Sequence, residues 1–459
     1  MTNANFPRPT SRREFLRATS CGFGALALAD LASGASAATV NPLAPKVPHF
    51  APRAKRVILL YMRGGPAHMD TFEYKPRLAI DDNKSVQAKT RKVLKSPWKF
   101  HQRGASGLWV SDLMPEVARH ADDLCVLAGM HTDVPNHPEA MVQLHTGSFQ
   151  FVRPSVGSWL LYGLGTENQN LPGFISISPP TINGGTQNYG SSFLPAMYQG
   201  TPIGQIRLPV KEARIGNIAN RMLPHGAQRD QLDLIQSLNR DLLAKQQVNT
   251  ELEGVIESYE LAFRMQSEVP RVMDISSETQ DTLDLYGIDD PMTDNFGRQC
   301  LLARRFAESG VRFIECCQEF WDQHAGLVAG HTKNAQQTDK PIAGLLADLK
   351  RRGLLDETLV IWGGEFGRTP DSVKRDGRDH NAKGYCMWLA GGGVKRGFKF
   401  GATDDHGFEA VKDKVHLHDL HATILHLMGL DHTRLTYRYA GRDFRLTDVY
   451  GRVVDEILA

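Results

Sequence analysis

The chain has 459 residues, of which 41% are hydrophobic and 23% are charged, and its formal net charge at neutral pH is +2. These are values of a globular protein that is long enough for one large domain or two ordinary ones. The nearly balanced charge, with no concentrated basic patch beyond the N-terminal segment, argues against a nucleic-acid partner. No later stretch is long and apolar enough to cross a bilayer, so we expect no stable membrane insertion.

The N-terminal segment contains the three parts of an export signal in their usual order. A basic stretch holds Arg12-Arg13, an apolar stretch of small residues follows from 21 to 32, and Ala35-Ser36-Ala37 offers a cleavage site. A disordered basic tail with a chance arginine pair would not explain this order. The pattern predicts a twin-arginine signal peptide over residues 1–37 and a periplasmic or secreted protein.

Five cysteines remain after this signal. An odd number argues against a disulfide framework, and most of the five lie within apolar runs. We therefore expect buried, unpaired side chains at Cys125, Cys300, Cys316, Cys317 and Cys386.

The order of elements after the signal predicts an α/β fold. Residues 38–54 are rich in proline and alanine and predict a linker. Apolar runs with β-branched or aromatic residues predict strands at 56–62, 124–127, 174–177, 311–316, 358–362 and 385–389. Amphipathic patterns between several of them predict helices at 114–120, 296–309 and 342–352. Together they indicate one domain over 55–459, with a mostly parallel sheet and helices on both faces.

One region departs from this alternation, and we interpret it as an insertion or cap at about 180–290. Residues 180–225 are rich in turn-forming types, and 228–269 predict one or two long, highly charged helices. A dimer seam and a solvated face are both open readings of the helical part.

Acidic and histidine side chains follow the predicted strands. In open α/β sheets, ligands bind beyond the carboxyl ends of the strands. A single Asp-x-His arises often by chance, and a lone histidine is usually structural, but here several loops supply carboxylates and imidazoles. They are 64–71, 131–133, 136–137, 145–147, 321–324, 363–369 and 377–380. This ligand set predicts a divalent ion at one rim of the sheet.

Other motifs give weaker indications of function. His406 is a second-tier ligand candidate, and the histidines from 416 to 426 are best explained as helix-cap or surface residues. No G-x-G-x-x-G opens a helix after a strand, and no G-x-S-x-G occurs, so neither a dinucleotide site nor the usual esterase site is indicated.

Four of these segments, 64–72, 321–324, 364–370 and 377–380, resemble the exported family known as domain of unknown function 1501, which is commonly labelled sulfatase-like. More loosely, the chain resembles the alkaline phosphatase superfamily. That resemblance implies a two-metal α/β hydrolase of phosphate or sulfate esters. By position, Asp322 and His324 match ligands of one metal, with His380 as its last histidine, and Glu365 matches an acid of the second metal.

The resemblance also has gaps. Phe366 stands where a ligand histidine is expected, and Arg63 stands where the first strand normally ends in a ligand Asp, for which Asp70 is a substitute candidate. Asn136-His137 fall at the nucleophile, so the usual hydroxyl or modified cysteine is absent there. No Cys-x-Pro-x-Arg occurs, which excludes a formylglycine sulfatase.

The first hypothesis is an exported metal-dependent hydrolase of sulfate or phosphate esters that uses metal-activated water. Its ion is zinc, calcium or manganese, and its substrate is a small-molecule or polysaccharide ester. His137 is a nucleophile, a base or a further ligand, and Arg368 binds the anion. The expected metal ligands are Asp70, Asp322, His324, Glu365 and His380, with Asp379 in reserve.

Two alternatives remain. One is a catalytically degenerate binding or structural protein on the same fold. The other is a secreted oxidoreductase with a bound cofactor, for which no cofactor motif is present.

Overall fold

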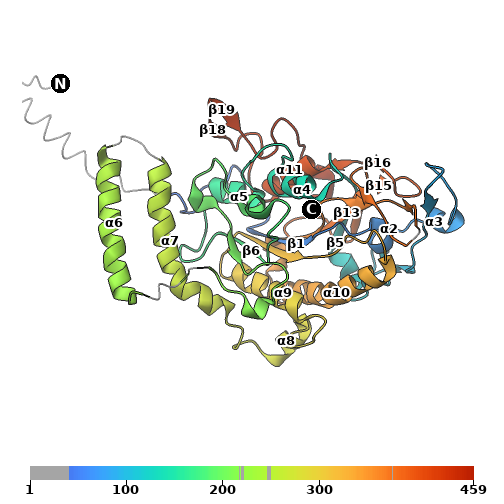
Figure 1. The fold of residues 1–459 in the computed structure, drawn as a ribbon, viewed down its shortest axis with the longest axis horizontal. Helices are drawn as coiled ribbons and strands as arrows, with labels where there is room; N and C mark the ends of the chain where they lie inside the picture. The colour runs from blue at the N-terminus through green and yellow to red at the C-terminus, as the bar shows by residue number, and fades with distance from the viewer. Residues whose placement is uncertain (1–40, 217, 219–221, 246–249, 375) are drawn as a thin grey trace, which may run out of the picture. The chain divides into compact units, whose positions relative to one another are not determined.

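The computed structural model describes residues 41–459 apart from 217, 219–221, 246–249 and 375 (Figure 1). The predicted signal peptide at 1–37 lies outside the described residues. Residues 43–54, within the expected linker, have no regular helix or strand. They lie against the domain, since the main-chain N–H groups of Arg53 and Ala54 donate to Leu427 O at 2.8 and 2.9 Å.

A mostly parallel sheet forms the centre of the domain. Its strands run in the order β14-β5-β13-β9-β1-β8-β6-β7, and β17 pairs with β5. β13 is antiparallel to both of its neighbours, and the other pairs are parallel. The bounds are β1 (Arg56–Met62), β5 (Leu124–His131), β6 (Phe174–Ile177), β7 (Thr201–Ile203), β8 (Phe313–Gln318), β9 (Thr358–Gly363), β13 (Tyr385–Ala390), β14 (Phe398–Phe400) and β17 (Val415–His416).

Helices cover both faces of this sheet, as the sequence predicted. In Figure 1, α4, α5 and α11 lie above the sheet, and α9 and α10 lie below it. Their bounds are α4 (His137–Thr146), α5 (Val156–Leu164), α9 (Asp294–Glu308), α10 (Leu327–Arg351) and α11 (Leu417–Leu427). The remaining short elements are α2 (His68–Thr71), α3 (Arg77–Ile80) and the two-stranded pairs β2 (Lys92–Val93) with β11 (Asp371–Ser372), β3 (Phe100–Arg103) with β4 (Leu108–Ser111), β10 (Gly367–Arg368) with β12 (His380–Asn381), β15 (Ala402–Thr403) with β16 (Ala410–Lys412), and β18 (Tyr437–Tyr439) with β19 (Arg442–Phe444).

The sheet supplies the core because its central strands are apolar along their whole length. Every residue of β1, β9 and β13 is buried. Trp362 of β9 stacks on Trp388 of β13 with nearly parallel rings, and the edge of Phe72 meets both. Strands buried on both faces are what helices on both sides of a sheet require.

The structure shifts several predicted boundaries. β5 continues to His131, and β8 spans Phe313–Gln318, two residues later than expected. The helix expected at 342–352 is the end of α10, which begins at Leu327. The helix expected at 114–120 is a 3-10 helix over Val117–Asp123. The Asp339 carboxylate accepts the N–H groups that begin it, a tertiary contact that no local pattern reveals.

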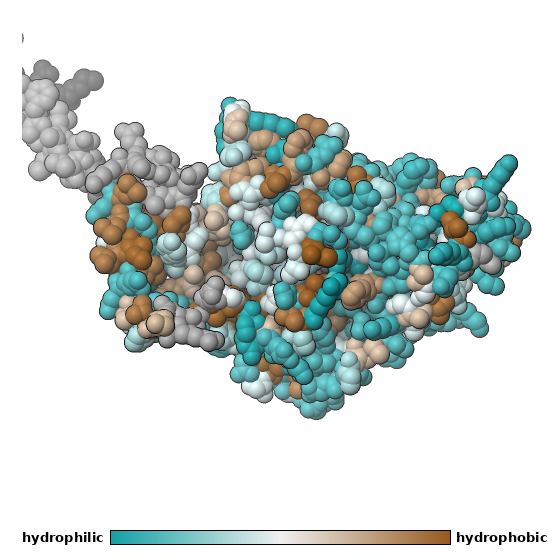
Figure 2. All heavy atoms as spheres, viewed as in Figure 1, coloured by the Kyte–Doolittle hydropathy of each residue, from teal (hydrophilic) through white to brown (hydrophobic). Residues whose placement is uncertain are grey.

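The region 180–290 contains two long helices, as the charge pattern predicted. These are α6 (His225–Lys245) and α7 (Thr250–Met273), followed by α8 (Gln280–Tyr286). Arg229 of α6 forms a two-pronged ion pair with Glu260 of α7. The outer face of α6 also exposes an apolar stripe, which is visible in Figure 2 and is formed by Leu234, Leu238 and Leu242.

The five cysteines predicted to be buried and unpaired are buried and free of disulfides. Within the described part of the chain, no helix is both long enough and apolar enough to span a bilayer.

Buried histidines make the fold sensitive to acid. His331 and His421 are fully enclosed, and burial lowers the pKa of each to about 3. In the unfolded chain such a ring takes up a proton near pH 6.5. Protons therefore bind the unfolded state preferentially, and the free energy of unfolding falls as the pH drops below that value.

We predict that His421→Asn removes one proton from this dependence. Between about pH 6 and 4, the slope of the unfolding free energy against pH should decrease by about 1.4 kcal/mol per pH unit. Urea unfolding at a series of pH values measures this slope. An unchanged slope would mean that His421 already carries a proton in the folded protein.

Candidate metal centre

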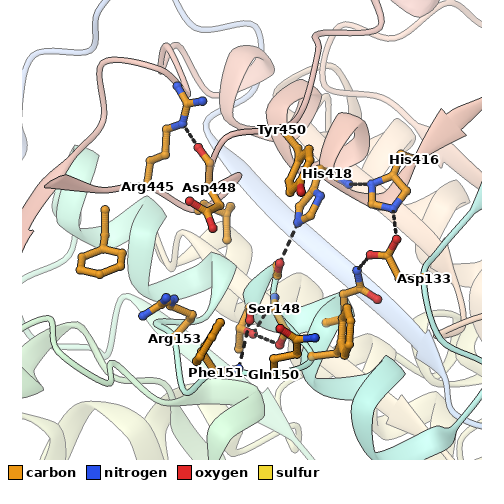
Figure 3. Close-up of a pocket in the computed structure, with 16 residues that line it drawn as sticks. Asp133, Ser148, Gln150, Phe151, Arg153, His416, His418, Arg445, Asp448 and Tyr450 are labelled. Atoms are coloured by element: carbon orange, nitrogen blue, oxygen red, sulfur yellow. Dashed lines mark hydrogen bonds and ion pairs between the residues drawn. The ribbon is translucent and has the colours of Figure 1, made fainter. Parts of the chain in front are cut away.

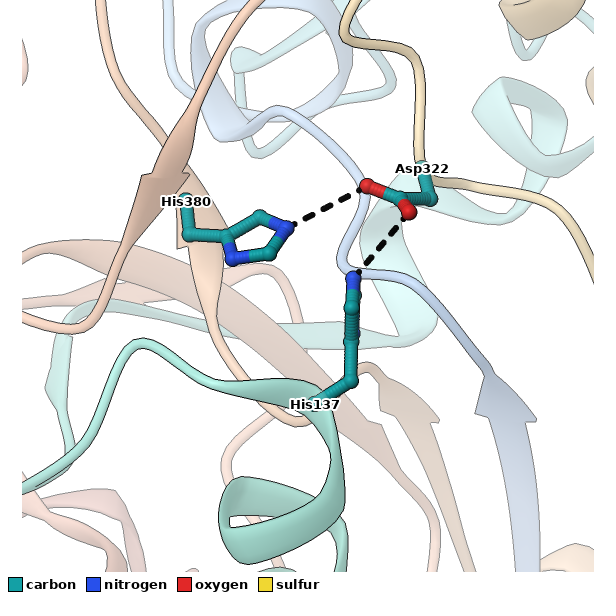
Figure 4. Close-up of side chains that lie close together, drawn as sticks. All are labelled: His137, Asp322 and His380. Carbon is teal, nitrogen blue, oxygen red and sulfur yellow. Dashed lines mark hydrogen bonds and ion pairs between the residues drawn. The ribbon is translucent and has the colours of Figure 1, made fainter. Parts of the chain in front are cut away.

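The Asp322 carboxylate lies where several loops meet at one rim of the sheet. Asp322 and His324 follow β8, His380 lies on β12 beyond β9, and His137 begins α4 after β5. Figure 4 shows His137 and His380 directed at the two carboxylate oxygens of Asp322. One ligand atom from each of these three residues lies within 4.8 Å of the others. The structure thus brings residues far apart in sequence to one point.

The distances around Asp322 are short and similar. Oδ1 is 3.1 Å from His324 Nε2 and 3.3 Å from His380 Nε2. Oδ2 is 3.2 Å from His137 Nε2, in a contact that is not aligned as a hydrogen bond. The Nε2 atoms of His324 and His380 are 3.0 Å apart. Two nitrogen lone pairs at that distance repel, so a proton or a cation has to lie between them.

Each imidazole is held by its other nitrogen. His137 Nδ1 is 2.6 Å from Glu365 Oε1, and His324 Nδ1 is 2.9 Å from Asp379 Oδ1. His380 Nδ1 donates to the Pro135 carbonyl at 2.6 Å. A carbonyl only accepts, so neutral His380 carries its lone pair on Nε2, which faces Asp322. Orienting partners of this kind are usual for metal-binding histidines.

These atoms fit a divalent ion. Ligands about 2.0–2.1 Å from a tetrahedral zinc are about 3.3 Å from each other. The separations of 3.0–3.3 Å around Asp322 are close to that spacing. Imidazole nitrogen with carboxylate oxygen suits borderline ions such as zinc, whereas calcium prefers oxygen alone.

The charges of the centre depend on one another. Burial alone would raise the pKa of Asp322, but His137, His380 and the Arg368 guanidinium hold that pKa well below its usual value. Burial alone would lower the pKa of His137, but the carboxylates of Asp322 and Glu365 outweigh it and raise that pKa to about 9. Asp322 is therefore ionised at neutral pH, and its charge is available to a cation.

Arg368 is buried and fully engaged. One of its terminal nitrogens is 2.6 Å from Asp322 Oδ1 and also contacts the Gly64 carbonyl. Its other nitrogens donate to the carbonyls of Gly65 and Arg378. The structure thus places Arg368 behind Asp322, where it orients the carboxylate.

The tight packing of the loop after β1 fixes this arrangement. Gly64 and Gly65 have φ angles of +110° and +84°. A Cβ on Gly64 would lie 2.8 Å from Asp322 N, and one on Gly65 would lie 2.6 Å from Phe366 O. Only glycine permits both this backbone conformation and this approach.

Two other candidate ligands have different neighbours. Asp70 is completely buried and forms a two-pronged ion pair with Arg378, at 2.7 and 3.0 Å. The structure does not bring it to the histidines around Asp322. Asp379 contacts both His324 and, at 2.6 Å, Arg91. Asp379 therefore reaches Asp322 only through His324, whose ring it orients.

The residues that the resemblance assigned to a second metal are engaged by other protein groups. The Glu365 oxygens accept hydrogen bonds from Tyr61 Oη and Gly64 N as well as from His137. The Phe366 ring packs 4.8 Å from the ring of His137. Arg63 is paired with Glu319. Among the residues that the structure describes, a single group of possible ligands is found, and it consists of His137, Asp322 and His380.

Sequence reasoning did not single out three supporting groups, namely Arg91, Tyr61 and the Pro135 carbonyl. Tyr61 lies inside an apolar strand and Arg91 in a stretch without a motif, so neither had a local signal. Pro135 contributes only its backbone.

We predict that Asp70→Asn destabilises the protein without removing a metal ligand. The change leaves the buried Arg378 charge without its partner, which typically costs about 3–5 kcal/mol. Denaturant unfolding measures the loss, and metal analysis of the folded fraction measures binding. The matched control is Asp443→Asn, which breaks an exposed pair with Arg438 and should cost less than about 1 kcal/mol. A folded Asp70→Asn protein that has lost its metal would place Asp70 among the ligands.

The comparisons with known proteins give a distant structural likeness and a direct family match. No curated protein matches the sequence. Among solved structures, the chain is similar to the PsFucS1 sulfatase from Pseudoalteromonas sp., with 13% identity, coverage of 83% of this chain and 68% of that one, and a TM-score of 0.37. It is also similar to the lipoteichoic acid synthase LtaP from Listeria monocytogenes, with 9% identity, coverage of 89% of this chain and 79% of that one, and a TM-score of 0.37. A third similar structure is the alkaline phosphatase from the Antarctic bacterium TAB5, with 12% identity, coverage of 83% of this chain and 99% of that one, and a TM-score of 0.33.

The family assignment rests on the sequence match alone. The proteins of unknown function DUF1501 match residues 54–458, which is nearly all of the chain beyond the predicted signal and linker. The chain therefore belongs to the DUF1501 family.

Proposed function

We propose that this protein is an exported hydrolase of sulfate or phosphate esters that holds one divalent ion, with zinc as the first choice. One observation supports this above all. Three imidazole nitrogens converge on one ionised carboxylate at separations close to those around a tetrahedral ion.

We assign the ion to Asp322, His324 and His380. His137, whose spacing would also allow it to be a ligand, is kept as the proton carrier because Glu365 engages its Nδ1. When bound, such an ion supplies a water of lowered pKa and stabilises negative charge on the ester oxygens. The ligand residues are well placed to receive it, because their side chains are 41%, 46% and 22% exposed at the rim. Three protein ligands leave a fourth position open, as catalytic zinc sites require.

We assign to His137 the transfer of a proton. Its Nδ1 is engaged by the buried Glu365, so the ring exchanges a proton only at Nε2, which faces Asp322. A carboxylate that holds one nitrogen of a histidine fixes the orientation of the ring and stabilises its charged form. The leaving alkoxide of an ester needs a proton, and His137 is the residue we assign to supply it.

Arg368 is assigned a positioning role. Because its nitrogens already contact Asp322 and backbone carbonyls, it orients the carboxylate.

A binding or structural protein on the same fold is the second candidate. It is favoured by Phe366 at the place of an expected ligand histidine and by the engagement of Glu365 by protein donors. Such a protein would hold the ion without turnover.

The metal and the reaction are tested together. We expect the matured protein to contain about one equivalent of metal and to hydrolyse nitrophenyl sulfate or nitrophenyl phosphate in a chelator-sensitive way. Asp322→Ala should lose the metal. His137→Gln should keep it while turnover falls about 10²–10⁴-fold, because only the proton carrier is removed. His101→Gln, on the exposed strand β3, is the control.

A metal-loaded protein that turns over neither ester would favour the binding protein. An Asp322→Ala variant with full metal content would contradict the ligand assignment.

Export is tested at the arginine pair. We expect Arg12→Lys with Arg13→Lys to leave the uncleaved protein in the cytoplasm, because a receptor reads the pair. Cell fractionation with immunodetection measures this. Normal periplasmic accumulation of the double variant would rule out the twin-arginine route.

A further inference from the structure

A second cavity lies at the opposite end of α4 from His137. Its volume is about 560 Å³. Figure 3 shows Arg153 and Arg445 on one side of it and His416 and Asp133 on the other. α4 spans ten residues from His137 to Thr146, so its length separates this cavity from the metal centre by about 15 Å.

Arg153 is a cation with no carboxylate in direct contact among the described residues. Its guanidinium lies 5.0 Å from the ring centre of Phe151 and 4.4 Å from that of Phe444. The Asp448 carboxylate acts on it only from beyond ion-pair distance, and the Arg153 side chain is partly buried. Two flanking rings hold the side chain in place, so an incoming anion meets an ordered donor.

The acidic groups of the cavity are already engaged. Asp133 contacts His416 at 3.3 Å and accepts from the Gln143 amide. Asp448 is paired with Arg442. With Arg442, which pairs with Asp448, three arginines and two carboxylates lie at this cavity, so it favours a negatively charged occupant.

Aromatic side chains line the rest of the cavity. Phe151 and Tyr450 are 59% and 61% exposed. The Tyr450 ring stacks on His418 with an interplanar angle of 10°. Exposed aromatic faces beside polar groups suit a sugar ring, which has apolar C–H faces and a polar edge.

The cavity also has a connection to the metal centre. Asp133 lines it and also lines a neighbouring cavity of about 360 Å³, whose wall includes His380 and Pro135. The two cavities thus share a wall residue and reach from Arg153 to the proposed metal ligands.

We propose that the Arg153 cavity binds an acidic sugar residue, whose charge is a sulfate ester or a carboxylate. Resting on the function proposed above, we further infer that this residue belongs to the same saccharide chain whose ester lies at the metal centre.

Binding by the full matured protein tests this without turnover. Calorimetry is carried out with three probes, namely a sulfated dextran tetrasaccharide, a galacturonate tetrasaccharide and neutral maltotetraose. We expect at least one acidic probe to bind and the neutral one to bind at least tenfold more weakly. Arg153→Gln should weaken acidic binding at least tenfold, and Tyr450→Ala should weaken it as well. The control, Arg119→Ala on an exposed surface, should not.

Asp322→Ala separates the two proposals. If Asp322→Ala abolishes turnover but leaves the affinity for the acidic probe within about twofold, the cavity is a binding site separate from the metal centre. If the unaltered protein binds the acidic probe but hydrolyses neither ester, the result supports the cavity proposal and contradicts only the proposed hydrolase activity. Binding lost in Asp322→Ala and kept in folded Arg153→Gln would overturn the proposal, as would equal binding of the neutral probe or no binding of either acidic one. Thermal unfolding confirms that each variant is folded.

Discussion

The ion pair between Arg368 and Asp322 is the constraint on which the centre depends. Arg368 is 1% exposed, and a charge withdrawn from water needs partners that replace its hydration. It finds them in the carboxylate of Asp322 and in carbonyls of Gly64, Gly65 and Arg378. Loops that follow three different strands are thereby held to one point. The carboxylate that completes this set is the one the histidines face.

A buried hydrogen bond between Tyr61 and Glu365 links the centre to the core of the sheet. Glu365 is completely buried directly after β9, and Tyr61 of β1 donates to it. Burial opposes its ionisation, yet its hydrogen bonds with His137 and Gly64 keep the pKa of Glu365 below its usual value. His137 is thus positioned by two central strands, although it begins a helix on the face of the sheet.

The sequence was informative where the signal is periodic or topological. Continuous apolar runs predicted β1, β6, β9 and β13 closely, because burial on both faces leaves no room for polar residues. The rule that loops at the carboxyl ends of strands meet indicated why residues after β8 and β9 should be neighbours. Element boundaries were predicted less accurately, since α10 begins fifteen residues before the stretch that its pattern marked.

The sequence did not reveal which side chain each charged residue contacts, and those contacts decide its role. Asp70 and Asp322 are both acids beside glycine-rich or aromatic segments, but one faces a buried guanidinium and the other faces imidazoles. The sequence predicted that Arg368 binds an anion, whereas in the structure its donors contact Asp322 and backbone carbonyls. No motif in the sequence marked Arg153, because its environment is formed by residues far along the chain, such as Phe444.

These placements bear on which ester the proposed centre would favour. A second divalent ion would bring two more positive charges, but Glu365, the acid that the resemblance assigned to it, is paired with His137. Arg368 is neutralised by Asp322, so it does not add an uncompensated charge. A sulfate monoester carries one negative charge, whereas a phosphate monoester carries up to two near neutral pH. Since electrostatic stabilisation has to match the charge of the transition state, a centre with one ion and a proton donor is better suited to the singly charged ester. The unpaired Arg153, about one helix length away, would then meet a second acidic group of the same saccharide.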